Sequence, residues 1–230
     1  HAVWGQEHAP SDSSVVVIAI DEETYRTPPF QDTPKVMWTK QIAKVIEQLS
    51  RSGASVIGFD IVLPTSVEPF IKGYDREFML ALRRAAKREK IVLAKVQHQI
   101  KSISPFAGHS FAVGHQKNIR SVNLYNDEDG IIRRVPLYFN DLSSEHGSSV
   151  ELSFSAEIAS RSTGQQLHLD AESKNIFLSD YKIPGGNQNA LTVNFDGGPE
   201  IPTYSLADIH ACVERQEATF LNDNFKDKIV

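Results

Sequence analysis

Cysteine is almost missing from this chain of 230 residues, which contains one, Cys212. A single cysteine excludes an internal disulfide, and no CxxC motif or Cys/His cluster has the spacing of a zinc site. Such low usage fits a reducing cytosol and equally a large bacterial periplasmic domain. We expect Cys212 to be a small buried hydrophobic residue on a helix rather than a reactive thiol.

Long apolar runs and an excess of positive charge are missing too. The longest uninterrupted apolar run is residues 15–20, far short of the ~20 residues that span a bilayer. The chain has 24 Lys and Arg against 29 Asp and Glu, a net charge of −5. This balance argues against nucleic acid as a partner, because such binding needs a basic surface. With 40% hydrophobic and 23% charged residues, the composition indicates a globular fold and excludes a disordered chain.

The first hundred residues show strand and helix patterns in alternation. Continuous apolar stretches predict short strands at residues 15–20, 55–59 and 91–94. A 3.6-residue period predicts a helix over residues 39–51, with Thr39 as its cap and Gly53 as its stop, and a second helix from Asp75. Strands separated by helices of this length pair in parallel through right-handed crossovers.

The second half of the chain has a different pattern. Turn residues at 126–130 lie between two alternating stretches, 121–125 and 131–139, which predicts a hairpin. A third helix is expected over residues 149–162, with Ser148 and Glu151 as a capping box. The remaining predictions are strands at 176–178 and 191–195, separated by a Pro-Gly-Gly loop at 184–186, and a last helix from Ser205.

These patterns predict an α/β fold: a mainly parallel, helix-flanked sheet (a three-layer sandwich) with an antiparallel hairpin insertion. We expect residues 1–14 to be an N-terminal extension and residues 15–230 to be a single domain. Residues 228–230 have the pattern of the first residues of another buried strand. The domain is therefore expected to be truncated at its C-terminal end.

Candidate binding residues follow from the predicted sheet, because ligands of parallel α/β sheets bind outside the carboxyl ends of the strands. Asp21 and Asp60 directly follow the first two strands, and Trp38 lies in the long loop after the first one. Arg133 follows the hairpin turn, from which it could reach an acidic partner such as Asp21 or Asp60. The alternative interpretation is that the two aspartates cap turns and that the aromatic residues cover the sheet edge.

The search for a catalytic constellation gives a negative result. If Asp21 and Asp60 converged, Mg²⁺ or Ca²⁺ would be the expected ion, but the Asp-x-Asp motif of a phosphotransfer nucleophile is missing. Residues 108–112 partly match a nucleophile elbow, which we reject because residues 111–113 look extended. The eight histidines show no metal-binding spacing. No metal and no cofactor is predicted.

Several stretches, taken in order, resemble the CHASE type-two (CHASE2) family of extracellular sensory domains. Each stretch is weak alone, but the ordered set covers nearly the whole chain from residue 15. The stretches are VVVIAIDEETY (15–25), Trp38, IAKVIEQLSRSGASVIGFDIVLP (42–64), YDREFMLALRRA (74–85), Gly114-His115, DEDGIIRRVPL (127–137), VNFDGGPEIPTYSLADI (193–209) and FKDKIV (225–230).

The resemblance implies a non-catalytic sensor on the periplasmic or extracellular face of the bacterial inner membrane, held there by flanking membrane helices outside this chain. The expected partner is an unknown small-molecule or protein signal, and a homodimer is one arrangement left open. The signal would control a cytoplasmic nucleotide cyclase, diguanylate cyclase, histidine kinase or Ser/Thr kinase. The ligand-binding candidates remain Asp21, Trp38, Asp60 and Arg133.

Two other functions remain open at this stage. One is a metal-dependent α/β hydrolase that uses Asp21 and Asp60. The other is a mechanical or dimerisation spacer that binds no ligand.

Overall fold

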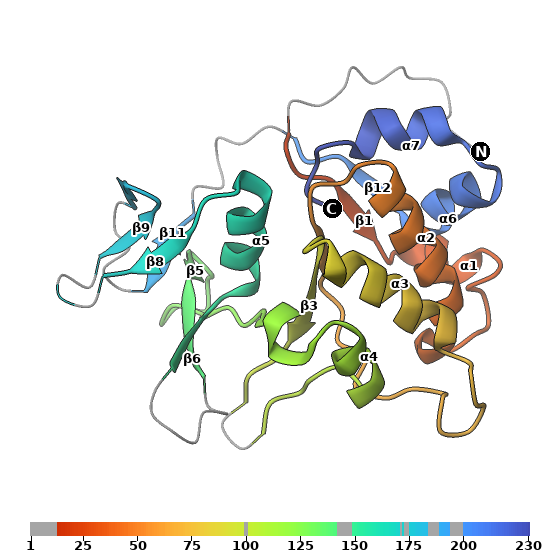
Figure 1. Cartoon of the computed structure of the whole chain (residues 1–230), viewed down its shortest axis with the longest axis horizontal. Helices are drawn as coiled ribbons and strands as arrows, with labels where there is room; N and C mark the ends of the chain where they lie inside the picture. The colour runs from red at the N-terminus through yellow and green to blue at the C-terminus, as the bar shows by residue number, and fades with distance from the viewer. Residues whose placement is uncertain are drawn as a thin grey trace.

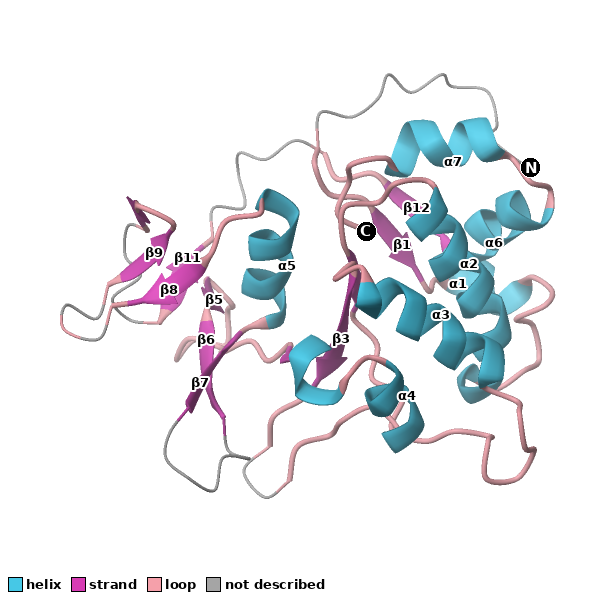
Figure 2. Ribbon diagram, viewed as in Figure 1, coloured by secondary structure: helices cyan, strands magenta, loops and turns pink. Residues whose placement is uncertain are grey.

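The structure is a computed structural model that describes residues 13–98, 101–141, 149–170, 172, 175–183, 189–193 and 200–230. Figure 1 shows a larger part, on the right, built around parallel strands, and a smaller part, on the left, built from antiparallel strands and helix α5 (Phe154–Thr163). Most helices belong to the larger part, as Figure 2 shows. The α/β class predicted from the sequence is confirmed.

The sheet of the larger part has the order β12, β1, residues 229–230, β2, β3, β4, and all of its pairings are parallel. Ile229 bridges Val15 on one side and Val56 on the other, so the last two residues join the two halves of the sheet. The strands are β1 (Val17–Ala19), β2 (Ile57–Phe59), β3 (Ile91–Lys95), β4 (Ile119–Ser121) and β12 (Thr203–Ser205).

Helices cover both faces of this sheet, which gives the predicted three layers. The main hydrophobic core lies between one face and four helices, α2 (Thr39–Arg51), α3 (Arg76–Lys87), α6 (Leu206–Glu214) and α7 (Ala218–Phe225). On the other face, Val56 and Val92 pack against Ile158 of α5. Because both faces are buried, consecutive residues of β3 are apolar rather than alternating with polar ones.

Helix α2 illustrates how an apolar stripe in the sequence places a helix on the sheet. Its buried side consists of Ile42, Val45, Ile46 and Leu49, the residues of the predicted apolar stripe. Gly53 follows the helix with φ of +87°, a conformation that side chains disfavour. Cys212 is fully buried on α6, as expected. The remaining helical segments are α1 (Glu22–Arg26), η1 (Lys35–Met37), α4 (Ala107–Ala112) and η2 (His115–Asn118).

The smaller part consists of three antiparallel strand groups. Its core contains Leu137, Tyr138 and Ile176 of the strands and their flanks, and Ala156 of α5. The groups are β6 (Tyr138–Asp141) with β7 (Ser149–Leu152), β5 (Arg134–Pro136) with β11 (Ala190–Thr192), and β9 (Ile176–Leu178) between β8 (Leu167–Leu169) and β10 (Tyr181–Lys182).

The predicted hairpin forms only at its turn. The Gly130 amide donates to the Asp127 carbonyl at 2.8 Å, and Tyr125 bridges Arg134 in the antiparallel sense. Before the turn, however, β4 pairs in parallel with β3, and after it β5 pairs with β11. A local alternation of apolar and polar residues predicts a strand, but it does not show whether that strand pairs with its neighbour in the sequence or with a distant strand.

Two further element predictions were wrong. Residues 149–152 form β7 rather than the start of a helix, and α5 begins after Ser153, whose hydroxyl accepts from the Ala156 amide at 3.2 Å. Glu151 binds Lys95 instead of capping a helix. Residues 111–113 are not extended, because α4 runs to Ala112. The predicted loop at 184–186 lies outside the described residues.

Gly58 lies where β2 contacts α5, so a larger residue at this position tests that contact. A Cβ atom at this position would lie 2.4 Å from Ile158 Cδ1 and 3.1 Å from Phe154 Cζ. We predict that Gly58→Val lowers the free energy of unfolding by about 1–3 kcal/mol, because it overpacks this contact. Urea denaturation measures the change. Ile158→Ala in the same chain should recover part of the loss, whereas strictly additive losses would contradict the packing described here.

Candidate functional site

The carboxyl ends of the parallel strands lie along one edge of the sheet, and the polar residues that follow them are the first place to look for a site. Asp21 follows β1, Asp60 follows β2, and Lys95 and Ser121 are the last residues of β3 and β4. Between β1 and β2, residues 229–230 continue the sheet.

Asp21 holds the local structure at the end of β1. Its carboxylate caps α1, accepting from the Thr24 amide and hydroxyl at 2.9 Å each and from the Ser205 hydroxyl at 2.8 Å. Partial burial alone would raise the pKa of Asp21, but the hydrogen bonds from Thr24 and Ser205 outweigh it and hold that pKa below its usual value. Asp21 thus ties α1 to β12, the capping interpretation considered from the sequence.

Trp38 is a core residue. Only 1% of its surface is exposed, its ring packs edge-on against Phe30 with centroids 5.2 Å apart, and its Nε1 donates to the Thr33 hydroxyl at 2.7 Å. The indole therefore stabilises the loop between α1 and α2 from inside. A ligand at the sheet edge would contact Trp38 only if this loop moved.

Asp60 lies beside a cavity of about 490 Å³ between β1 and β2, which we call the β1–β2 slot. Burial of its carboxyl among neighbouring groups raises the pKa of Asp60, although the residue as a whole reaches solvent. Lys35 is the other charged residue of the slot. The aliphatic lining includes Val17, Ile18 and Ile20 of β1, Ile42 and Val45 of α2, Ile57 of β2, Phe154 and Ile158 of α5, and Val230.

Backbone groups also face the slot. The Val16 amide donates to the Ile229 carbonyl at 2.8 Å, and the Gly58 amide donates to the Val230 carbonyl at 2.7 Å. The slot thus lies on the line of the strand that residues 229–230 form between β1 and β2, directly beyond the last residue of the sequence.

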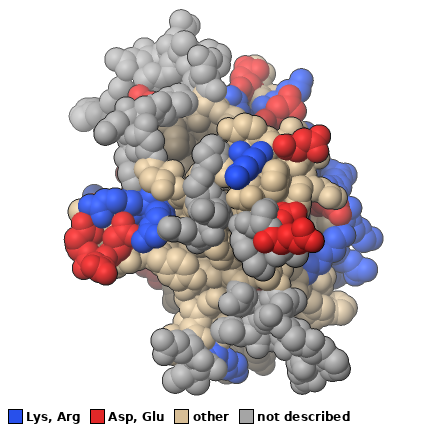
Figure 3. Space-filling view, turned by 90° about the vertical axis from the view of Figure 1, so that its left-hand side faces the viewer, with Lys and Arg blue, Asp and Glu red and all other residues tan. Residues whose placement is uncertain are grey.

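Arg133 lies far along the chain from this edge and has its own partners. Its guanidinium binds Asp129 at 2.7 Å and Asp127 at 3.3 Å, and Arg134 also binds Asp127. These exposed pairs fix the turn before β5 and do not involve Asp21 or Asp60. Figure 3, drawn from the side of the smaller part, shows Lys and Arg lying next to Asp and Glu on this face.

The four predicted residues thus occupy different environments. Asp60 lines the slot, and Asp21 follows Ile20, which also lines it, but the Asp21 carboxylate is held by Thr24 and Ser205. Trp38 is covered, and Arg133 is paired within its turn. A ligand-binding role for the four residues remains a prediction.

Sequence reasoning missed a buried polar cluster centred on Asp75, which is fully buried at the start of α3. Its carboxylate accepts from the Thr39 hydroxyl at 2.7 Å, from the Ser66 hydroxyl at 2.5 Å, and lies 2.9 Å from His109 Nε2. Thr39 was predicted to cap α2, but Trp38 occupies that position and the Thr39 hydroxyl serves Asp75 instead. The cluster joins α2, α3, α4 and the loop after β2.

The His109 ring is enclosed by Phe78 and Phe106, with centroids 5.0 and 5.3 Å away, and its Nδ1 is buried without a hydrogen-bond partner. This is a structural cluster rather than a catalytic triad, because Ser66 and His109 both bind Asp75 instead of each other. The sequence carried one indication of this cluster, the polar residues Thr39 and Asp75 at two predicted helix starts.

A second missed cluster connects the two parts of the molecule. Lys95, 5% exposed, donates to Glu151 of β7 at 2.9 Å, and Glu151 also accepts from the Ser121 hydroxyl at 3.0 Å. A buried ion pair of this kind is retained only with good geometry and additional hydrogen bonds, as here. Glu151 was assigned to a helix in the sequence analysis, so its partner could not be predicted.

Among the described residues, no group of three or more His, Cys, Asp or Glu side chains could hold a metal ion. No described helix has the length and apolar character needed to cross a bilayer.

His109 gives a testable dependence of stability on pH. Burial lowers the pKa of His109 below its usual value, and the contact with Asp75 offsets this only in part. Burial likewise lowers the pKa of His210. The unfolded chain therefore takes up protons first as the pH falls through about 6.5, so the folded state loses stability below that pH.

We predict that the free energy of unfolding falls between pH 7 and pH 5, and that His109→Gln and His210→Gln each reduce this slope. Urea titrations at several pH values measure it, and the slope remains readable if the variants are less stable overall. An unchanged slope in the doubly substituted chain would contradict neutral buried histidines.

Comparison with known proteins agrees with the geometry of an α/β domain that has no catalytic constellation among its described residues. The family model described as "CHASE2 domain" matches residues 2–230. No curated protein and no solved structure matches the chain. Since the family match spans essentially the whole sequence, the chain belongs to the CHASE2 family of extracellular sensory domains of signalling receptors.

Proposed function

We propose that this chain is the periplasmic input domain of a membrane-bound bacterial receptor, and that a signal bound near Asp60 at the carboxyl edge of the sheet controls a cytoplasmic output domain. The single observation that carries this proposal is the match of the CHASE2 family model to residues 2–230. The carboxyl edge is the place where parallel α/β sheets bind ligands. The output would be a nucleotide cyclase, a diguanylate cyclase, a histidine kinase or a Ser/Thr kinase.

Helix α5 is placed to transmit a change. Its residue Ile158 packs against Val56 and Val92 of the sheet, and its residue Glu157 binds Arg120 of β4 at 2.9 Å. A signal acts only through unequal affinity for two conformations, and a signal that repositioned α5 would shift the smaller part relative to the sheet. No observation favours the hydrolase that uses Asp21 and Asp60, because the Asp21 carboxylate is already occupied by internal hydrogen bonds.

Asp60 and Asp21 give a matched pair of variants. We expect Asp60→Asn to retain full stability at pH 7, because its raised pKa means that the ionised carboxyl is disfavoured in the folded state. Asp21→Ala should lower the free energy of unfolding by about 0.5–2 kcal/mol through loss of a helix cap. Thermal melts measure both changes.

In the full-length receptor, the same two variants distinguish a role in signal binding from a role in the stability of the fold. Asp60→Asn should alter the response of the output domain, whereas Asp21→Ala should keep the response at temperatures where the domain is folded. Unchanged signalling in Asp60→Asn, together with a lost response in folded Asp21→Ala, would reverse the assignment.

A ligand screen tests the proposal directly. Thermal-shift screening of the chain against metabolites and ions should find a ligand that raises the melting temperature, and Asp60→Asn should remove that shift. A ligand that stabilises wild type and Asp60→Asn equally would bind elsewhere, and a screen without any ligand would favour a spacer.

A further inference from the structure

A second concave surface lies on the side of α3 that faces α4, away from the β1–β2 slot. This surface, the α3–α4 groove, has a volume of about 470 Å³. Its floor is apolar, made by Met79, Leu80 and Ala86 of α3 with Phe111 and Ala112 of α4. Phe111 is 70% exposed, an unusual position for a large aromatic side chain.

The two helices approach closely at Gly108, the second residue of α4. A Cβ atom there would lie 3.2 Å from Met79 Sδ and 2.9 Å from Phe106 Cε1. The residues of the floor therefore already pack against one another. Helix α4 is held in place by His109, whose Nε2 lies 2.9 Å from an Asp75 carboxylate oxygen. The groove is a preformed feature between fixed helices.

Four cationic side chains line the groove. Arg76, Arg83 and Lys87 come from α3, and Lys117 comes from η2. The three α3 residues are spaced by seven and four positions, so they share one face over about 16 Å of helix. Within the described part of the chain, no carboxylate lines the groove, and only Lys117 has a carboxylate partner, Glu89 at 3.0 Å.

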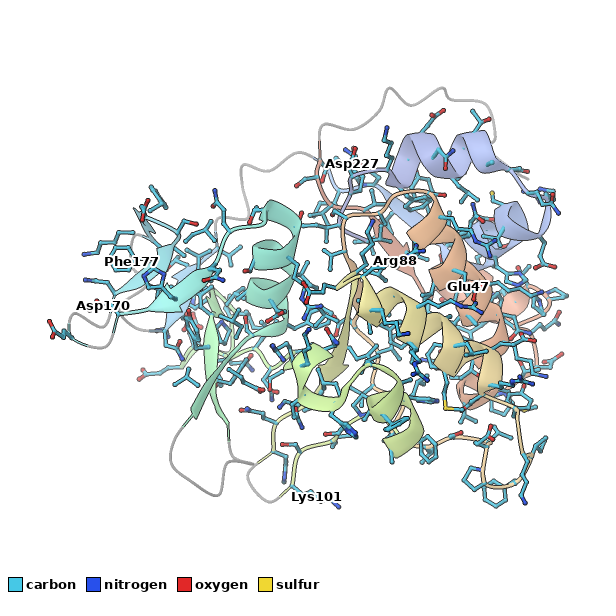
Figure 4. All side chains as sticks on the ribbon, in the orientation of Figure 1. Glu47, Arg88, Lys101, Asp170, Phe177 and Asp227 are labelled. Atoms are coloured by element: carbon cyan, nitrogen blue, oxygen red, sulfur yellow. The ribbon has the colours of Figure 1, made fainter. Side chains whose placement is uncertain are left out.

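The opposite side of α3 differs. Arg84 faces α2 and binds Glu47 there. Figure 4 labels Glu47 on the side of α3 away from α4. Arg84 is thus paired within the domain, whereas Arg76, Arg83 and Lys87 have no carboxylate partner among the described residues.

We propose that the α3–α4 groove binds an acidic amphipathic helix of a partner protein. A helix that lays an apolar stripe on the Leu80 and Phe111 side chains places its flanking residues beside the cations, a common mode of helix recognition. The distribution of charge decides between this occupant and a lipid. A fatty acid or lipid carries its charge at one end, whereas three of these cations are spread over about 16 Å of α3. The site is separate from the slot and goes beyond the proposed function.

The test uses the 230-residue chain and a fluorescent synthetic helix of 14 residues, with leucine on one stripe and glutamate on the other positions. We expect saturable binding that weakens as salt rises, since the rim charges are exposed. Arg83→Glu combined with Lys87→Glu should weaken binding at least about tenfold. Lys182→Glu, the same kind of charge change on β10, should leave it unchanged.

Ala112→Trp blocks the floor without changing a charge and should also abolish binding, which keeps the test independent of the charge variants. A helix with lysine in place of glutamate should not bind. The proposal is overturned by no binding at about 1 mM peptide, the weak limit of specific affinity. Equal binding of the lysine helix, or full binding by Ala112→Trp, would overturn it as well. So would vesicles of anionic phospholipid that bind in place of the peptide and respond to the same variants.

Discussion

The continuity of the sheet depends on the backbone hydrogen bonds of the last two residues of the chain, Ile229 and Val230. Ile229 receives the Val16 amide on one side, and Val230 both donates to Val56 and accepts from Gly58 on the other. These contacts connect β1, near the start of the chain, with β2 and its neighbours. Without them, β12 and β1 would be joined to the rest of the sheet by side-chain packing alone. Such long-range parallel pairing costs loop-closure entropy and is stable only when both faces are covered.

The helices are divided between the two faces of the sheet. Helices α2, α3, α6 and α7 bury one face, and the single helix α5 buries the other. Because α5 also carries the smaller part, the second face is covered by an element with two sets of partners. Gly58 allows α5 to approach β2, and Glu157 holds it to Arg120. The position of α5 therefore depends on its contacts with both β2 and β4.

The sequence was most informative where local pattern and final structure agree. The apolar stripe of α2 and the buried run of β3 are local signals, and both were predicted closely. The errors fall where a residue serves a distant partner. Thr39 and Glu151 match capping patterns, yet they bind Asp75 and Lys95, partners that no local pattern identifies. For the candidate site, the edge of the sheet could be predicted from strand order, but Trp38 and Arg133 have partners that depend on the tertiary fold.

The contacts between the smaller part and the sheet are of two kinds. At the ends of β3 and β4, Lys95, Glu151 and Ser121 form a satisfied buried polar network, which favours a single arrangement. On the face of the sheet, Ile158 of α5 packs on Val56 and Val92, and aliphatic packing can rearrange without breaking polar contacts. A displacement of α5 over the sheet would have to break the polar network or pivot about it, so this network constrains any movement between the two parts.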